Sequence, residues 1–145
     1  MAARWVVLLF VLAWPLTGWT EPFGFAINSD DEIDPNQLLR IDLANGQIQA
    51  IGQLPLIDIE GLALSSDGVL YGVDDGTKNL VRIDPSNAAL ETVGNLGFPQ
   101  TERRDFGLSF ACDGRLLLVA EQTRSLYEVD TDTGQAILIL SLIHI

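Results

Sequence analysis

The chain has 145 residues, 20 of them acidic and 8 basic, so its formal net charge at pH 7 is −12. This balance argues against nucleic acid and anionic lipid surfaces as partners, because both are bound through cationic side chains. The one cysteine, Cys112, has no partner in the chain for a disulfide, so burial of apolar side chains has to stabilise the fold.

The N-terminal segment has the layout of a secretory signal peptide. Arg4 precedes an apolar run at residues 5–16, and small or weakly polar residues follow at 17–20. The run is shorter than the roughly 20 apolar residues that a membrane-spanning helix needs, which makes a membrane anchor the weaker alternative. We therefore expect residues 1–20 to be a signal peptide and the mature chain to be extracytoplasmic, periplasmic or secreted, without membrane contact.

After this segment the chain repeats one pattern in nearly three copies, at residues 23–54, 60–96 and 106–139. The second and third copies align without a gap, so Gly61 falls on Gly107 and Asp67-Gly68 falls on Asp113-Gly114. The first copy matches the second over residues 38–54 but lacks an opening segment. Gapless repetition of this kind predicts one structural unit that is used several times in a row.

Each copy contains short apolar or alternating runs separated by turn residues, which is typical of strands. Asp67-Gly68 and Asp113-Gly114 are dipeptides of type I′ hairpin turns. The next hairpin of each copy begins at an equivalent aspartate, and these are Asp42, Asp84 and Asp130. A carboxylate in this position accepts backbone N–H bonds two residues on, so we expect these three residues to be structural.

Four antiparallel strands in about 40–50 residues are the signature of a β-propeller blade. The sequence therefore predicts an all-β fold with about three consecutive four-stranded blades, the first incomplete. A β-sandwich is the alternative, but it does not predict gapless repetition. Because propellers have typically 4–8 blades, we expect residues 21–139 to be the N-terminal part of a longer propeller.

The last residues, 140–145, read LSLIHI and form a very apolar end to the chain. Back-translated as CTG TCT CTT ATA CAC ATC, they match a transposon-end adaptor of sequencing libraries. We therefore expect a non-native, adaptor-derived tail, in which case His144 carries no meaning. A genuine final strand is the alternative.

Ligand sites of propellers gather where the second strand leads into the third and where the chain enters each first strand. The corresponding loops here are rich in carboxylates, at residues 28–36, 55–60, 74–79, 97–105 and 121–125. Oxygen ligands around a channel suit a hard cation such as calcium. A solvated acidic rim built from turn-forming aspartates is the alternative.

Residues 60–84, EGLALSSDGVLYGVDDGTKNLVRID, resemble the exported six-bladed propellers related to regucalcin and gluconolactonase. This segment and the family share a Glu-Gly pair that opens an inner strand, followed by Leu-Tyr-x-Val-Asp and Arg-x-Asp. YVTN-type and NHL-type secreted bacterial propellers share the Asp-Gly, Leu-Tyr and Asp elements. The resemblance to the lactonase family implies a divalent metal on Glu60. We expect Asn28, Asp74 or Asp75, from the neighbouring rim loops, to lie near this metal.

A second candidate site lies in the sequence ERRD at residues 102–105. Arg103 and Arg104, beside Asp105, would hold an anionic ligand, or would pair with neighbouring acids instead. The sequence offers no nucleophile with a nearby base, so we name no catalytic residue. Cys112 stands where the preceding copy has Ser66, and a partner for its thiol would have to come from outside this chain.

Two functions remain open on this basis. The first is an exported propeller that serves as a binding or interaction module for a protein, a glycan or a small molecule. The second is a calcium-dependent hydrolase of the lactonase or esterase kind, which depends on Glu60 and on analogy of fold.

Overall fold

The computed structural model describes residues 22–28, 36–55, 58–100, 105–121 and 123–141. These residues form eleven strands and no helix. None of the described segments is therefore a helix that could cross a membrane. The proposed signal peptide at residues 1–20 lies outside the described residues, as do residues 142–145.

The strands form three antiparallel sheets that follow one another along the chain. The first sheet has three strands, β1 (Phe23–Ile27), β2 (Gln37–Asp42) and β3 (Ile48–Gln53). The second has four, β4 (Ile59–Leu64), β5 (Leu70–Asp74), β6 (Asn79–Ile83) and β7 (Leu90–Asn95). The third also has four, β8 (Phe106–Phe110), β9 (Leu116–Ala120), β10 (Ser125–Val129) and β11 (Ala136–Ser141).

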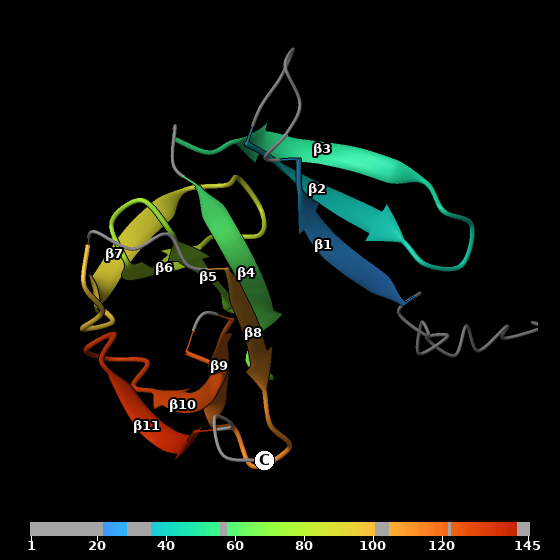
Figure 1. Cartoon of the computed structure of the whole chain (residues 1–145). Coiled ribbons are helices and arrows are strands. Elements are labelled where there is room, and N and C mark those ends of the chain that lie inside the picture. The colour runs from blue at the N-terminus through green and yellow to red at the C-terminus, as the bar shows by residue number, and fades with distance from the viewer. Residues whose placement is uncertain (1–21, 29–35, 56–57, 101–104, 122, 142–145) are drawn as a thin grey trace, which may run out of the picture.

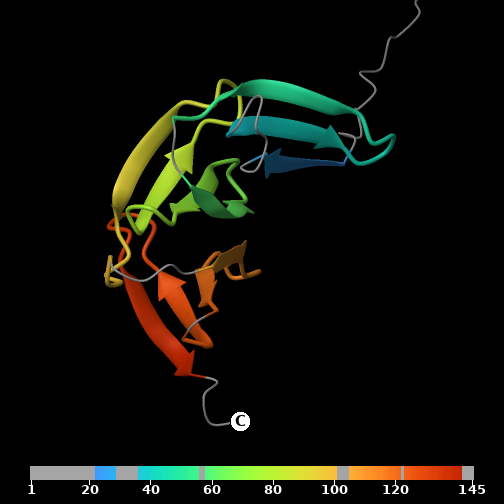
Figure 2. The same cartoon turned by 45° about the horizontal axis from the view of Figure 1, so that its top comes forward.

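Within each sheet the strands lie in chain order, and the sheets succeed one another along an arc (Figures 1 and 2). The fourth strands, β7 and β11, and the last strand of the first sheet, β3, lie on the outside of the arc, whereas β4 and β8 lie inside (Figure 2). This is the arrangement that the repeats predict, including the first sheet without its opening strand.

The apolar core lies between consecutive sheets in two separate clusters. One cluster joins the first and second sheets and includes Leu38, Leu70 and Val81. The other joins the second and third sheets and includes Val73 and Leu118. The second sheet is therefore covered on both faces. Neighbouring side chains of its strands point in turn to one cluster and to the other, as the two-residue period of a strand requires.

The repeat is also visible in the backbone, because the residues with positive φ fall at equivalent positions of the copies. The three sets are Asn36, Lys78 and Arg124; Gly46, Ala88 and Gly134; and Gly68 and Gly114. A non-glycine residue with positive φ is uncommon, so four of them at repeating positions indicate one turn design that is used in every copy.

The Asp-Gly hairpins form where the sequence predicts them, but the type I′ assignment is wrong. Only the glycines, Gly68 and Gly114, have positive φ, at 87° each, whereas a type I′ turn needs it at both central residues. The Gly68 N–H donates to the Ser65 carbonyl and the Ser65 N–H to the Val69 carbonyl. This is a type I turn followed by a left-handed glycine, which adds one residue to the loop.

The aspartates of the next hairpin have the structural role that the sequence predicts. The Oδ1 atoms of Asp42, Asp84 and Asp130 each accept the backbone N–H two residues further on, at 2.8 Å in all three copies. Hydrogen bonds from Ser86 lower the pKa of Asp84, and backbone N–H groups lower that of Asp130.

The expected tail at residues 140–145 overlaps β11 at its first two positions. Leu140 pairs with Leu126 and Ser141 with Ser125 in the antiparallel ladder between β10 and β11. The adaptor origin of this tail stays a prediction, because the pairing of two residues in a sheet does not show which DNA encoded them.

Candidate functional site

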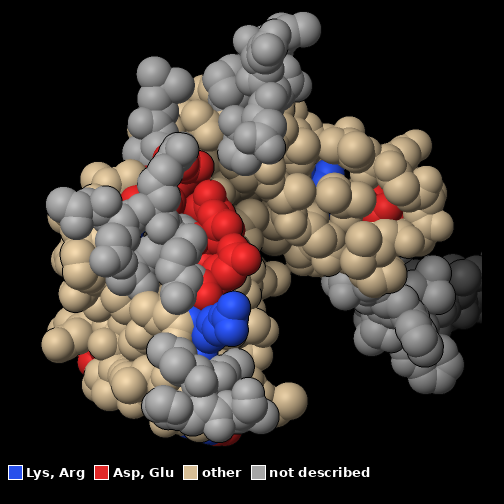
Figure 3. Space-filling model, in the orientation of Figure 1, with Lys and Arg blue, Asp and Glu red and all other residues tan. Residues whose placement is uncertain are grey.

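The predicted functional rim lies where β4 and β8 begin and where β5 and β9 end. Ile59 at the start of β4 pairs with Asp74, and Phe106 at the start of β8 pairs with Ala120. The two inner strands are also in direct contact, since a Cβ added to Gly61 would lie 2.9 Å from the Cβ of Leu108. Acidic side chains gather in one band over this part of the molecule (Figure 3).

Glu60 lies at a β-bulge at the start of β4. The register shifts between Ile59 and Gly61, so Glu60 is the extra residue of the bulge, and its side chain is exposed. Bulges of this kind redirect a side chain and occur often beside functional sites. The structure therefore presents Glu60 on the rim, at the same end of the sheet as Asp74.

Asp74, by contrast, is buried and holds its own turn. Its Oδ1 accepts the Gly76 N–H at 3.0 Å, and its Oδ2 accepts the hydroxyl of Thr77. Asn28, the equivalent residue of the first copy, accepts the Gln37 N–H on its Oδ1 at 2.6 Å. Both residues thus use side-chain oxygens to order the loop between the second and third strands, as the turn alternative predicts.

Asp75 forms a buried ion pair with Lys78, which sequence analysis did not single out. The Lys78 ammonium also donates to the Asp75 carbonyl at 2.6 Å and lies 5.6 Å from the centre of the Phe106 ring. Lys78 is only 1% exposed, so its charge depends on these partners. The feature of the sequence that could have predicted this ion pair is the spacing of Asp75 and Lys78, which are three residues apart.

The four residues of the predicted calcium site therefore differ in exposure, since Glu60 is exposed, Asn28 is half-buried, and Asp74 and Asp75 are buried. Among the described residues, no three His, Cys, Asp or Glu side chains are placed together so as to hold a metal ion. The calcium site stays a prediction.

The third copy brings two carboxyl groups together on the same rim. Asp105 precedes β8 and Glu121 follows β9, and the Glu121 N–H donates to the Asp105 carbonyl at 3.1 Å. A side-chain hydrogen bond with Asp105 and the negative charge of that residue raise the pKa of Glu121. Of the predicted anion site, Arg103 and Arg104 lie outside the described residues, so the structure places only Asp105.

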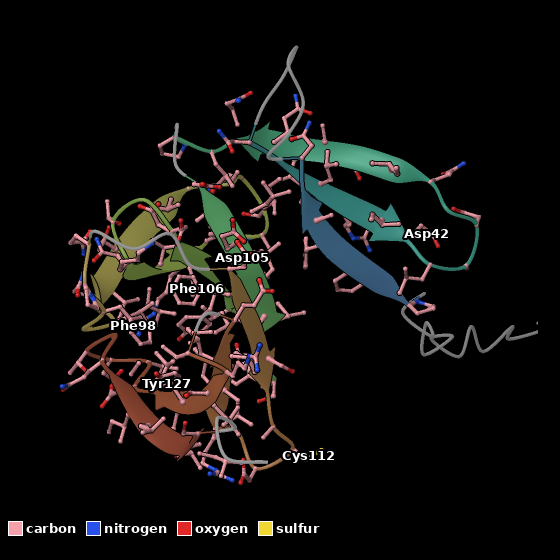
Figure 4. All side chains as sticks on the ribbon, viewed as in Figure 1. Asp42, Phe98, Asp105, Phe106, Cys112 and Tyr127 are labelled. Atoms are coloured by element: carbon pink, nitrogen blue, oxygen red, sulfur yellow. The ribbon has the colours of Figure 1, made fainter. Side chains whose placement is uncertain are left out.

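An aromatic group that the sequence did not single out fills the space between the second and third sheets, behind this rim (Figure 4). The rings of Phe98 and Phe106 stack at 5.6 Å, and Tyr127 meets Phe98 edge to face at 5.0 Å. Such pairs contribute about 0.5–1.5 kcal/mol beyond their buried area. They fix the start of β8, and with it Asp105, relative to the second sheet.

A groove of about 610 Å³ lies at the opposite end of the same two sheets. The Asp67 and Asp113 hairpins form its walls, and Tyr71 and Phe110, edge to face at 5.6 Å, line it. Cys112 also lines this groove with a free, exposed thiol. Its position beside the equivalent hairpin of the second sheet agrees with the alignment of Cys112 on Ser66.

Several solved structures resemble this chain in fold. A protein of unknown function from Bacteroides thetaiotaomicron is 18% identical with a TM-score of 0.63, over 79% of this chain and 29% of that one. A chain of the nidogen–laminin complex is 16% identical with a TM-score of 0.60, over 83% and 44%. A gluconolactonase from Xanthomonas campestris is 19% identical with a TM-score of 0.56, over 77% and 36%.

These likenesses confirm the fold predicted from the repeats, which is an all-β β-propeller fragment with three consecutive antiparallel blades. The chain spans 29% to 44% of the length of these three structures. No protein-family model and no curated protein matches the chain.

Proposed function

We propose that the chain is an exported binding module whose acidic rim receives a positively charged group of its ligand. The observation that carries this proposal is the pair of carboxyl groups of Asp105 and Glu121. The side-chain hydrogen bond with Asp105 and the repulsion between the two negative charges both raise the pKa of Glu121. A cationic group between them would remove this repulsion, so binding would be coupled to the loss of a proton.

The surroundings of the pair support a binding role. Asp105 directly precedes a strand whose first residue, Phe106, stacks on the Phe98 ring, so the position of Asp105 is ordered by this contact. Glu60 adds an exposed carboxylate on the neighbouring strand, and the net charge of −12 favours the approach of cations over the whole chain.

A short peptide rich in lysine and arginine is the probe for this proposal. Calorimetric titration should show binding that weakens with salt and is reduced about tenfold by Glu121→Gln. Asp113→Asn, which removes a carboxylate in the groove at the opposite end, is the matched control and should bind like the unaltered chain. Equal loss in both variants would mean that the peptide senses only the net charge and not this rim.

The second candidate function is a calcium-dependent hydrolase of the lactonase or esterase kind. Its supporting observation is Glu60, which projects from a β-bulge into solvent at the start of an inner strand. Here millimolar calcium should raise the melting temperature, and Glu60→Gln should abolish the rise. Glu91→Gln, which alters an exposed glutamate on the outer strand β7, should leave it unchanged. A melting temperature that does not change with calcium would rule out the calcium-dependent hydrolase.

A further inference from the structure

The groove between the second and third sheets combines aromatic, hydroxyl and carboxylate groups. Its walls are the two Asp-Gly hairpins, at residues 64–67 and 110–114, and Tyr71 and Thr131 complete its lining. Its volume of about 610 Å³ lies within the range of about 300–1,000 Å³ that is usual for small-molecule sites. The groove lies at the opposite end of these sheets from the acidic rim and shares no residue with it.

The aromatic part of the groove is fixed by contacts to both sheets. Phe110, at the end of β8, meets Tyr71 of β5 edge to face at 5.6 Å. The Tyr71 hydroxyl accepts a hydrogen bond from Nε of Arg82 at 3.3 Å, and Nη2 of Arg82 donates to the Thr131 carbonyl at 2.8 Å. Tyr71 is buried, whereas Phe110 is only half-buried. Phe110 therefore presents an apolar surface that needs no further ordering when a ligand binds.

The carboxylates of the groove have neighbouring donors of their own. Nε of Arg115 donates to Oδ2 of Asp113 at 2.8 Å, and this hydrogen bond lowers the pKa of Asp113. The hydroxyl of Ser65 donates to Oδ1 of Asp67 and lowers the pKa of Asp67, with a smaller contribution from the charge of Arg82. Both aspartates are thus ionised at neutral pH, and a cationic ligand would compete with the two guanidinium groups.

The remaining hydrogen-bonding capacity of the groove fits the hydroxyl groups of a ligand. An ionised carboxylate has about four acceptor positions, and the bonds above use only some of those of Asp67 and Asp113. Ser66 and Thr131, which also line the groove, carry hydroxyl groups that can donate and accept. An anion would be repelled by the two aspartates, and a wholly apolar ligand would remove them from water without replacing their hydrogen bonds.

We propose that this groove binds a short neutral saccharide. A pyranose ring has C–H groups on one face, which pack on an aromatic ring, and hydroxyl groups around its edge, which donate to carboxylates. The Phe110 ring receives the C–H face, and Asp67 and Asp113 on the two walls accept the hydroxyl groups. This site is independent of the proposed binding of cations at the acidic rim.

Nuclear magnetic resonance titration of the full chain with cellotriose, maltotriose, mannotriose and tri-N-acetylchitotriose tests the proposal. At least one of these saccharides should shift the amide resonances of Ser65 and Cys112 and leave that of Gln53 in the first sheet unchanged. We expect a dissociation constant of about 1 mM or below. The shifts should persist in about 1 M salt, because the ligand carries no charge that salt could screen.

Substitutions in the groove and outside it locate the site. Phe110→Leu removes the ring but keeps an apolar side chain, as at the equivalent position Leu64 of the second sheet, and should weaken saccharide binding about tenfold. Phe23→Leu makes the same change at an exposed ring of the first sheet and should have no effect. Asp67→Asn should also weaken binding about tenfold, because it removes a charge-assisted hydrogen bond. Its control is Glu91→Gln on the outer strand β7, which should bind like the unaltered chain.

The thiol of Cys112 gives a second, independent measurement, because it is the one cysteine of the chain and lines the groove. The saccharide at about ten times its dissociation constant should slow the reaction of Cys112 with iodoacetamide about tenfold, followed as the gain in mass of the chain. The proposal is overturned if none of the saccharides shifts the resonances of the groove. It is also overturned if Phe110→Leu or Asp67→Asn binds as tightly as the unaltered chain, or if the bound saccharide leaves the reaction rate of Cys112 unchanged.

Discussion

The second and third sheets are built from the same pattern and differ in what surrounds them. Val73 in β5 has no exposed surface, whereas its equivalent in β9, Val119, is 47% exposed. Lys78 is buried in an ion pair, whereas its equivalent Arg124 is exposed, although both follow a turn of the same backbone shape. The difference shows that a propeller sheet completes its core only through its neighbours, so position in the row decides burial as much as sequence does.

The largest expected difference between the two sheets concerns the buried ion pair. Lys78→Met should lower the free energy of unfolding by about 3–5 kcal/mol, because it leaves the Asp75 carboxylate buried without its partner. Arg124→Met in the third sheet should cost under about 0.5 kcal/mol. Denaturant unfolding of both variants measures the comparison, and similar losses would contradict it. Combining Lys78→Met with Asp75→Leu should recover most of the loss.

The next largest difference concerns two glycines. Gly94→Ala should cost about 2–3 kcal/mol, because the added methyl group meets the backbone of the incoming turn and the sheets must separate to accommodate it. Gly107→Ala adds a methyl group in open space at the start of the third sheet and should change stability by under about 0.5 kcal/mol. Thermal unfolding of the pair checks this, and a larger loss from Gly107→Ala would refute the account of how the sheets meet.

Val73 and its equivalent Val119 test whether a neighbouring sheet covers the side chain. Val73→Ala should cost about 2 kcal/mol, because it leaves a cavity between the second and third sheets. Val119→Ala should cost less, about 0.5 kcal/mol, since Val119 is already 47% exposed. Chemical denaturation of both variants would sharpen the comparison, and equal losses of stability would show that Val119 is as buried in the protein as Val73.

The smallest effect is a pH-dependent one on the rim. Because the folded-state pKa of Glu121 is raised, its contribution to stability is complete below the usual glutamate pKa of about 4.3 and is lost as pH rises through the folded value. Glu121→Gln should therefore raise the melting temperature slightly at about pH 7 and leave it unchanged at about pH 3. A variant that is less stable than the unaltered chain at neutral pH would show that the pair is not repulsive.

Much of the fold could be predicted from the sequence, because repeated turn residues act locally. Asp42, Asp84 and Asp130 each bind the backbone two residues on, and this geometry needs no information from distant segments. The same local information named Asp-Gly as hairpin residues but could not distinguish a two-residue from a three-residue loop, which depends on how the flanking strands pair.

The site was less predictable, because it depends on contacts between sheets. Asp75 reads as a cation ligand in the sequence, and only the fold shows that Lys78 binds it beneath the Phe106 ring. Glu60 is predicted as a metal ligand only through a resemblance, and its place at a β-bulge could not be predicted, because a bulge leaves no mark in the pattern of apolar residues. Likewise, Asp105 and Glu121 meet only when β8 and β9 pair.

The central claim is that the second and third sheets are equivalent blades packed face to face, and the one cysteine of the chain allows a direct test. A nitroxide on Cys112 should broaden the amide resonances of Ser65 and Asp67, which line the same groove, and leave that of Gln53 in the first sheet sharp. Sharp signals from Ser65 and Asp67, with broadening elsewhere, would contradict the packing of these two sheets and the account built on it.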